Sequence, residues 1–486
     1  MASAVKGLKP ELVWKYFARI SRIPRGSKNE TAMTRFIVDT AKKLGLSAQT
    51  DKLGNVVVRK PASAGLKKIR PVALQGHLDM VCEKNRDKDH DFLKDPIQLV
   101  RKGNILTADG TTLGADNGIA VATNLAIMED RTLRHGPLEF LFTVDEETGM
   151  TGVANLKPDF LESRTLLNLD SEEEGTLYVG CAGGKDTTGT WKFTCEKAPD
   201  RSIFAQVKVS NLKGGHSGLE IDKGRGNAIK IAGRALQALE AAGARISSID
   251  GGNKHNAIPR ECEASLFLPV KKIAAAEQIL GKLYATVKNE LAISEQDLKI
   301  DLTLDFRNRR NGKVLKRALQ KKILRVIAAL PHGVIKMSET IAGLVETSTN
   351  LAVIKTGKDS LTITTSQRSS VASKLAEIVD SVSSIFALGG ASVRYTDGYP
   401  GWEPDMESPI LKTARSVYRS LYGKSIKVKA IHAGLECGII GERIPGMDML
   451  SFGPTIEGAH SPDERIYIDS VEKFWKFLLE ILRRVR

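Results

Sequence analysis

The fold of this chain is decided by residues 72–81, which read VALQGHLDMV. Three apolar residues with strand character run almost straight into Gly76, and His77 and Asp79 follow two positions apart. On an extended chain, residues at i and i+2 face the same way, so both side chains leave one face of a strand end. Imidazole is the commonest transition-metal ligand, and a ligating His needs an acceptor to fix its tautomer. The stretch therefore predicts a strand that ends at a metal ligand with its orienting carboxylate, although a lone His-x-Asp pair is more often a surface feature.

Four later sites carry acids or a second His where a predicted strand ends, a helix begins or a loop follows a glycine. They contain Asp116, Glu146, Glu147, Asp170 and His460. Acids clustered at the ends of buried strands would repel one another strongly unless cations neutralised them. Two His and three carboxylates suit two divalent ions that share one bridging carboxylate, and one Glu is then left to act as a base on water. Taken singly, Asp116 also reads as a helix N-cap, the Glu pair as a solvated turn and His460 as a loop residue.

Strands and helices alternate over the first part of the chain. The predicted strands are 56–58, 72–75, 138–144 and 165–170, and the predicted helices are 10–22, 28–44 and 117–129. Ser27 and Glu30 form a capping box for the second helix, and Gly45 ends it. This alternation indicates an α/β domain with a mostly parallel sheet and helices on both faces, in which ligands collect beyond the carboxyl ends of the strands.

The pattern changes after Gly183 and Gly184. Half-polar strands then alternate with long amphipathic helices, which we predict at 225–243, 271–290 and 370–387. This indicates an α+β domain whose sheet has helices on one face. From about residue 403 the earlier pattern returns, with helices at 408–422 and 471–482. We therefore predict one α/β domain formed by 1–186 and 399–486, and an α+β domain, 187–398, inserted into it.

The inserted segment also looks doubled. Residues 204–294 and 300–395 each read as strand, helix, two strands and helix, with a closing strand. Asn256 precedes an apolar pair much as Asn350 precedes an apolar run. The sequence leaves two interpretations open, a doubled βαββαβ unit and one large α+β domain.

Composition restricts the class of protein. The chain has 486 residues, 42% hydrophobic and 5% aromatic, which is typical of a soluble globular protein with more than one core. No apolar run approaches the roughly 20 residues that cross a bilayer, and the N-terminus lacks the order of a secretory signal. The net charge of +15 arises from 72 basic residues interleaved with 57 acids, and no nucleic-acid motif is present. We therefore expect neither nucleic acid nor membrane as a partner. Five scattered cysteines without a C-x-x-C predict reduced thiols and a cytoplasmic location.

The chain resembles the M20 co-catalytic zinc peptidases in the order and spacing of these His and acidic residues. Four stretches narrow the resemblance to the aminoacyl-histidine dipeptidase branch (Xaa-His dipeptidase, peptidase D): 74–81, 168–172, 214–218 (GGHSG) and 431–438 (IHAGLECG). The resemblance spans nearly the whole chain, with no departure at any metal or base position. It implies that the α/β domain is a zinc-peptidase-like catalytic domain and that the inserted domain is a lid.

The resemblance implies two divalent metal ions per chain. His77, Asp116 and Asp170 would hold one ion, and Asp116, Glu147 and His460 would hold the other. Zn is the expected metal, although Mn and Co accept the same ligands. The resemblance further implies a cis peptide bond between Asp116 and Asn117.

It also implies three catalytic groups. Asp79 would orient His77. Glu146 would be the general base, taking a proton from the water between the ions and passing it to the leaving amine. His216, in a glycine-rich turn of the lid, would stabilise the oxyanion. For His432 and Glu436, which lie in one of the four stretches, the plainer reading left open is that they only cap a helix.

Four residues are implied to bind the substrate. Arg368 would grip its free carboxylate, bidentately if the geometry allows. Asn256 and Asn350 would hydrogen-bond the substrate, and the loop at Gly434 would meet the same carboxylate with backbone N–H groups. The plainer reading of Arg368 is a surface arginine.

The implied function is hydrolysis of unblocked dipeptides, including Xaa-His types such as carnosine. The alternatives are an N-acyl-amino-acid deacylase or aminotripeptidase on the same scaffold, or a non-catalytic binding protein. Because the lid segment looks doubled, we expect a monomer or homodimer in which each active site is complete within one chain.

Overall fold

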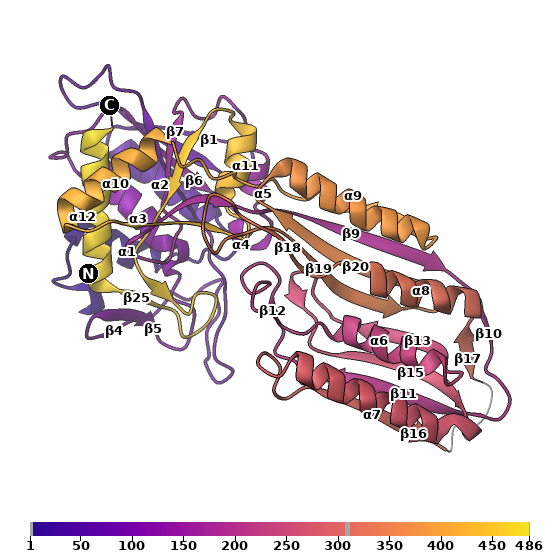
Figure 1. Ribbon diagram of the computed structural model, residues 1–486. Coiled ribbons are helices and arrows are strands. Elements are labelled where there is room, and N and C mark those ends of the chain that lie inside the picture. Colours follow the sequence, from indigo (N-terminus) through magenta and orange to yellow (C-terminus); the bar gives the residue numbers. More distant parts are fainter. Residues whose placement is uncertain (1–2, 307–311, 486) are drawn as a thin grey trace. The chain divides into compact units, whose positions relative to one another are not determined.

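The computed structural model describes residues 3–306 and 312–485, which divide into two compact units (Figure 1). The first unit consists of Met1–Gly180, Trp402–Ala430 and Leu435–Arg486, and the second of Cys181–Gly401 and Ile431–Gly434. The second unit therefore interrupts the first in sequence. Within the described ranges, no helix combines the length and the apolar character needed to span a membrane.

The first unit is built on an eight-stranded sheet in the order β1-β2-β6-β3-β7-β23-β8-β22. Its strands are β1 (Ser47–Thr50), β2 (Val56–Lys60), β3 (Val72–His77), β6 (Leu138–Thr143), β7 (Thr165–Asn168), β8 (Thr176–Cys181), β22 (Lys427–Ile431) and β23 (Asp448–Ser451). The pairings β6–β3, β3–β7 and β7–β23 are parallel. Every residue of β3 and β6 is buried, which explains their nearly continuous apolar sequences, since a parallel sheet is covered on both faces. The prediction of an α/β domain with a parallel-rich sheet is confirmed, while the pairings β1–β2, β2–β6 and β23–β8 are antiparallel.

Helices pack along this sheet. They are α1 (Glu11–Ile20), α2 (Thr31–Lys43), α3 (Ala115–Glu129), α4 (Glu146–Gly149), α5 (Thr151–Ala154), α10 (Pro409–Tyr422), α11 (Glu436–Arg443) and α12 (Ile468–Arg484). α3 packs on β3 and α1, α2 on β1 and β2, and α10 on β23 and α12. A smaller sheet in the order β24-β25-β5-β4 completes the unit. Its strands are β4 (Leu99–Lys102), β5 (Ile105–Ala108), β24 (Ile456–Glu457) and β25 (Arg465–Tyr467).

The predicted capping box at the start of α2 is wrong. The helix begins at Thr31, and the carboxylate of Glu30 accepts hydrogen bonds from the backbone N–H groups of Lys28 (2.8 Å) and Asp145 (3.0 Å). Ser27 Oγ donates instead to Asp79 Oδ2 at 2.7 Å. Both side chains therefore make tertiary hydrogen bonds, with Asp79 and Asp145, in place of the helix cap that the local sequence pattern predicts.

The second unit contains a long antiparallel sheet in the order β16-β11-β15-β13-β19-β20-β9-β21, with β18 also paired to β19. Its strands are β9 (Gly183–Lys192), β11 (Ser202–Ser210), β13 (Arg245–Gly251), β15 (Cys262–Pro269), β16 (Lys299–Asp305), β18 (Gly333–Met337), β19 (Val345–Thr356), β20 (Ser360–Ser369) and β21 (Ser392–Tyr395). Helices α6 (Ala228–Glu240), α7 (Ile273–Glu290), α8 (Arg317–Ala329) and α9 (Ala372–Leu388) lie along it (Figure 1). A shared apolar core contains Val207, Leu236, Leu266 and Ile363. The shorter strands are β10 (Cys195–Lys197), β12 (Gly215–His216), β14 (Ala257–Ile258) and β17 (Lys313–Leu315).

The strand order of this sheet is symmetrical about the β13–β19 pair. On one side the order outward is β13, β15, β11, β16, and on the other it is β19, β20, β9, β21. The sequence-based division at residues 294–300 is therefore wrong. β16 closes the first half by pairing with β11. The position of the second half that corresponds to β11 is filled by β9, which precedes the first half in sequence. The first half is thus inserted between β9 and α8.

Candidate metal centre

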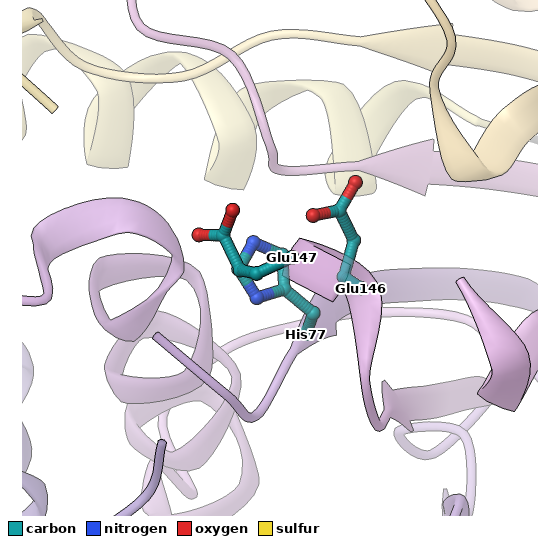
Figure 2. Close-up of side chains that lie close together, drawn as sticks. All are labelled: His77, Glu146 and Glu147. Carbon is teal, nitrogen blue, oxygen red and sulfur yellow. The ribbon is translucent and has the colours of Figure 1, made fainter. Parts of the chain in front are cut away.

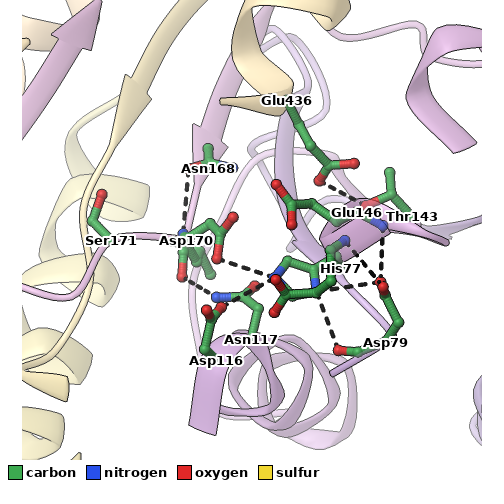
Figure 3. A network of polar contacts seen from close by, with 12 residues as sticks. His77, Asp79, Asp116, Asn117, Thr143, Glu146, Asn168, Asp170, Ser171 and Glu436 are labelled. Carbon is green, nitrogen blue, oxygen red and sulfur yellow. Dashed lines mark hydrogen bonds and ion pairs between the residues drawn. The ribbon is translucent and has the colours of Figure 1, made fainter. Parts of the chain in front are cut away.

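Four predicted site residues of the first unit lie at one end of its parallel strands, namely His77, Asp116, Glu146 and Asp170 (Figure 3). His77 is the last residue of β3, Asp170 follows β7 by two residues, and Glu146 opens α4 soon after β6. Asp116 is the second residue of α3. Because the carboxyl ends of neighbouring parallel strands meet at one edge of a sheet, residues far apart in the sequence converge there.

The ligand atoms form two groups that share one carboxylate. His77 Nε2 lies 3.1 Å from Asp116 Oδ1 and 3.4 Å from Asp170 Oδ1. His460 Nε2 lies 3.1 Å from Asp116 Oδ2 and 3.0 Å from Glu147 Oε2. Within each group the potential ligand atoms all lie within 4.8 Å of one another. The two oxygens of Asp116 thus face different groups, as a carboxylate that bridges two ions must do.

Asp79 lies behind this cluster and organises it. His77 Nδ1 lies 3.2 Å from the backbone oxygen of Asp79 and 3.4 Å from Oδ1. The Asp79 carboxylate also accepts hydrogen bonds from the backbone N–H groups of Glu146 (3.1 Å) and Glu147 (3.2 Å). Burial raises the pKa of Asp79, but the hydrogen bonds from His77, Ser27 and Glu146 outweigh it and lower the pKa to about 2. Asp79 is therefore an anion that fixes the ring of His77 and the turn carrying the two glutamates.

The electrostatics of the cluster fit divalent cations. Burial, reinforced by neighbouring acids, raises the pKa of Asp170 to about 6 and that of Glu146 well above its usual value. Glu147 Oε1 is buried and has no hydrogen-bond partner among the residues that the structure describes. Positive ions would relieve this concentration of negative charge, and imidazole with carboxylate is a donor set that zinc, manganese and cobalt accept.

The backbone next to Asp116 is tightly packed. The Asp116–Asn117 peptide bond is cis, as the resemblance implied. Asn117 Nδ2 donates to the backbone oxygen of Leu169 at 3.0 Å. A Cβ atom at position 76 would lie 2.5 Å from Asn117 Oδ1 and 2.7 Å from the Ala120 side chain. The glycine before His77 is therefore required by the close approach of β3 to α3.

The two adjacent glutamates occupy different positions (Figure 2). Glu147 lies in the group with Asp116 and His460, whereas Glu146 lies near Glu436 (Figure 3). Both can also be grouped with His77. Of the two, Glu147 shares a group with the carboxylate of Asp116, as the predicted ligand should, whereas Glu146 does not.

The second unit places His216 in a constrained turn. Its Nδ1 accepts hydrogen bonds from the backbone N–H groups of Gly218 (3.2 Å) and Leu219 (3.1 Å), so Nε2 carries the proton of the neutral ring. Burial, with the nearby charge of Arg368, lowers the pKa of His216 to about 4. A Cβ at position 218 would collide with the backbone oxygen of His432 and lie 3.0 Å from the His216 ring. The turn therefore presents a neutral imidazole with Nε2 as a donor.

Arg368 is not a surface arginine. It lies in β20 with 7% of its surface exposed, and its Nη1 donates to the Tyr399 hydroxyl at 2.6 Å. Its Nε is buried and has no hydrogen-bond partner within the described part of the chain. Tyr399 thus holds one arm of the guanidinium while another donor remains available.

The other expected substrate residues also lie in the second unit. Asn256 and His216 line a cavity of about 700 Å³. The side-chain Nδ2 of Asn350 donates to the backbone oxygen of Ala257 at 2.8 Å, while its buried Oδ1 has no partner in the described ranges. Gly434 ends the short segment Ile431–Gly434.

The helix-cap interpretation of His432 and Glu436 is wrong. His432 is buried, and its Nε2 lies 2.7 Å from Ser348 Oγ. Glu436 is fully buried in the first unit and accepts hydrogen bonds from Gln75 Nε2 and, at 2.8 Å, Thr143 Oγ1 (Figure 3). Burial raises the pKa of Glu436 to about 8. Their partners lie in distant strands, so the local sequence contained no signal for these contacts.

Comparison with known proteins identifies the family. Residues 73–484 match the profile of peptidase family M20/M25/M40. The chain is 40% identical over 484 residues to the cytosol non-specific dipeptidase of Escherichia coli (strain K12), covering 99% of each chain. It is 40% identical, with a TM-score of 0.92, to the crystal structure of aminoacylhistidine dipeptidase from Vibrio alginolyticus, covering 100% of this chain and 98% of that one. The aminopeptidase PepT from Bacillus cereus shares the fold, with a TM-score of 0.57 and 15% identity over 98% of this chain and 99% of that one. The chain is therefore a metallopeptidase of the M20/M25/M40 family.

Proposed function

We propose that this chain is a metal-dependent dipeptidase that hydrolyses unblocked dipeptides, including Xaa-His types such as carnosine. The observation that carries the proposal is the carboxylate of Asp116, whose two oxygens face two separate His-containing groups. The two relatives that match nearly the whole chain at 40% identity are dipeptidases, which favours this function over a deacylase or an aminotripeptidase. Because the family is metal-dependent, a non-catalytic binding protein is disfavoured. The cytoplasm is the location that fits the name of the Escherichia coli relative.

His77, Asp116 and Asp170 would hold one divalent ion, and Asp116, Glu147 and His460 the other. Zinc is the ion we expect, because imidazole and carboxylate ligands suit it. When bound, the ions act as Lewis acids, which polarise a carbonyl oxygen and make water more acidic.

Glu146 is the proposed general base. Burial raises its pKa well above the usual value, so its carboxylate is a stronger proton acceptor than an exposed glutamate. Its backbone N–H is fixed by Asp79, which also orients His77. Glu146 takes a proton from the attacking water and delivers it to the leaving amine.

His216 and Arg368 are the proposed substrate-binding groups of the second unit. His216 donates from Nε2 to the oxygen that becomes negatively charged, and its low pKa keeps the ring neutral. Arg368 binds the free carboxylate of the dipeptide, with one arm held by Tyr399. Asn256, Asn350 and the loop at Gly434 supply further hydrogen bonds to the substrate.

A substrate panel tests the function. Zinc-reconstituted protein is assayed on carnosine, Leu-Gly, a tripeptide and an N-acetyl amino acid, with the free amine measured. We expect both dipeptides to be cleaved far faster than the other two compounds. Faster cleavage of the tripeptide or of the N-acetyl amino acid would instead support one of the two alternative enzymes.

We predict that Arg368→Ala lowers kcat/KM for a free dipeptide by about 10- to 100-fold, since a hydrogen bond to a charged group contributes about 1.5–3 kcal/mol. Hydrolysis of a C-terminally amidated dipeptide should be low in the parent and nearly unchanged in the variant. Arg394→Ala, which removes an exposed arginine of β21, is the matched control. An Arg368→Ala enzyme that still strongly prefers the free acid would exclude this role.

We further propose that each active site is complete within one chain, whether the protein is a monomer or a homodimer. The symmetrical strand order supplies two lid-like halves in a single second unit. His216→Ala and Glu146→Ala, mixed under conditions that exchange subunits, should therefore recover no activity. Recovery of a substantial fraction of parental activity would show that His216 acts across a dimer.

A further inference from the structure

Glu464 is a buried glutamate that binds the backbone beside Asp116. Only 2% of its surface is exposed. Its Oε2 accepts hydrogen bonds from the N–H groups of Leu113 (2.7 Å) and Gly114 (2.9 Å), and its Oε1 from those of Ala115 (2.7 Å) and Asp116 (3.2 Å). One carboxylate thus satisfies four successive backbone donors of a largely buried segment.

Arg25 binds the same loop through a backbone carbonyl oxygen, whereas Glu464 binds its backbone N–H groups. It is 3% exposed, and its Nη1 donates to the backbone oxygens of Leu78 (3.0 Å) and Asp79 (2.9 Å). Its Nη2 donates to the backbone oxygen of Gly114, whose N–H binds Glu464. Arg25 therefore joins the chain after His77 to the chain before Asp116.

The glycines of this loop leave space for Arg25. A Cβ at position 114 would lie 2.5 Å from Arg25 Nη2, and one at position 118 would lie 2.6 Å from the same atom. Gly114 also has φ near +69°, which side chains other than glycine rarely adopt. The two glycines of the sequence GADNG around Asp116 are thus explained by the buried Arg25 side chain, which packs against both of them.

Two buried charges are costly unless their hydrogen bonds are well satisfied. Here Arg25 donates to three backbone oxygens, although its buried Nε has no partner in the described residues. Glu464 accepts from four backbone N–H groups, and all of these segments carry proposed metal ligands. Glu464 also follows His460 by four residues, and its own N–H donates to the backbone oxygen of Ser461 at 3.1 Å. It therefore connects the loop of His460 to the loop of Asp116.

We propose that Glu464 and Arg25 are positioning residues that set the distance between His460 and Asp116 and so prepare the site of the second ion. The inference rests on the proposed metal centre. The first ion would have His77 and Asp170 as additional ligands, which come from β3 and from just after β7 rather than from the loop of Glu464. Loss of Glu464 should accordingly weaken the second site much more than the first.

The test is a calorimetric titration of metal-free Glu464→Gln and of the metal-free parent with Zn²⁺. The melting temperature of each metal-free protein is measured as well. Glutamine keeps the shape but replaces one acceptor oxygen by an NH₂ group facing N–H donors. We expect one site to weaken by about 10- to 100-fold, the usual effect of removing a group that supports a metal ligand, and the other to change little. Glu457→Gln, an exposed glutamate in nearby β24, is the control.

The possible results distinguish failure of the positioning role from failure of the proposed metal centre. If the parent protein binds no Zn²⁺, the proposed metal centre fails. If the parent binds two ions and Glu464→Gln binds both with parental affinity, the positioning role is overturned. Equal weakening of both sites together with a lower melting temperature would show a merely structural role. If Glu464→Gln does not fold, Glu464→Asp, which keeps the charge but shortens the side chain, is measured by the same criteria. Arg25→Lys, compared with exposed Arg22→Lys, should weaken the second site too, and it should also affect the first, because Arg25 binds the backbone oxygens of Leu78 and Asp79 next to His77.

Discussion

Glu146→Gln should lower kcat for a dipeptide by about 10²- to 10⁴-fold, the usual contribution of a general acid–base group, while the protein still binds two ions. Glutamine has nearly the same shape as glutamate but cannot accept the proton from water. The orientation of the turn should survive, because Asp79 binds the backbone N–H of residue 146 and not its side chain. Steady-state assays give kcat, and the metal content of the protein after gel filtration gives the number of bound ions.

Glu147→Gln is the matched comparison at the adjacent position. Its carboxylate lies 3.0 Å from His460 Nε2, in the group that contains Asp116, so this variant should lose one ion. If Glu146→Gln loses metal and Glu147→Gln keeps it, the roles of the two glutamates are reversed. The contrast is informative because the two variants differ by a single position in the chain.

The central fold could be predicted because the hydrophobic pattern specifies it directly. β3 and β6 are buried along their whole length, so their sequences are largely apolar and do not alternate. Because the two strands are parallel neighbours, their carboxyl ends meet at one edge of the sheet. His77 and Glu146 could be placed near each other from this rule alone. His460, which is more than 300 residues further on, could be added from residue type as a second His beside these acids, but its grouping with Asp116 and Glu147 came only from the family resemblance.

The capping box and the division of the inserted segment were, like the helix-cap reading of His432 and Glu436, predicted wrongly because local sequence does not specify which distant segment a residue meets. Ser27 and Glu30 have the spacing of a capping box, yet they bind Asp79 and the N–H of Asp145. The strand from Lys299 onward was assigned to the second half of the inserted segment because it follows the first half. In the sheet it pairs with β11, and β9 takes the place in the second half that this strand was expected to fill.

Glu464 and Arg25 could not be found from the sequence for a different reason. Their partners are backbone N–H and C=O groups, which every residue carries, so no side-chain pattern marks the interaction. The only trace is the pair Gly114 and Gly118, which reads as ordinary loop glycine until the position of Arg25 is known.

Removing the ions with a chelator should abolish hydrolysis, and added Zn²⁺ should restore it. Without ions, hydrogen bonds to Asp116 and Glu147 raise the pKa of His460 to about 11, so this ring holds a proton at neutral pH that an incoming ion must displace. Below that pKa, each displaced proton lowers the apparent metal affinity by about tenfold per pH unit. Asp170, with a pKa raised to about 6, adds a second proton as the pH falls towards that value.

Zn²⁺ affinity should therefore fall by at least about 100-fold between about pH 8 and pH 6, with the steeper slope at the acidic end. Competition with a chromophoric chelator of known pH dependence gives the affinity, and recovery of dipeptide hydrolysis at each pH gives an independent measure. His460→Ala should bind the second ion more weakly and should lose the part of the pH dependence that this ring contributes. Metal affinity independent of pH in the parent protein would show that the ions do not bind through His460, and activity that survives complete metal removal would exclude the two-ion mechanism.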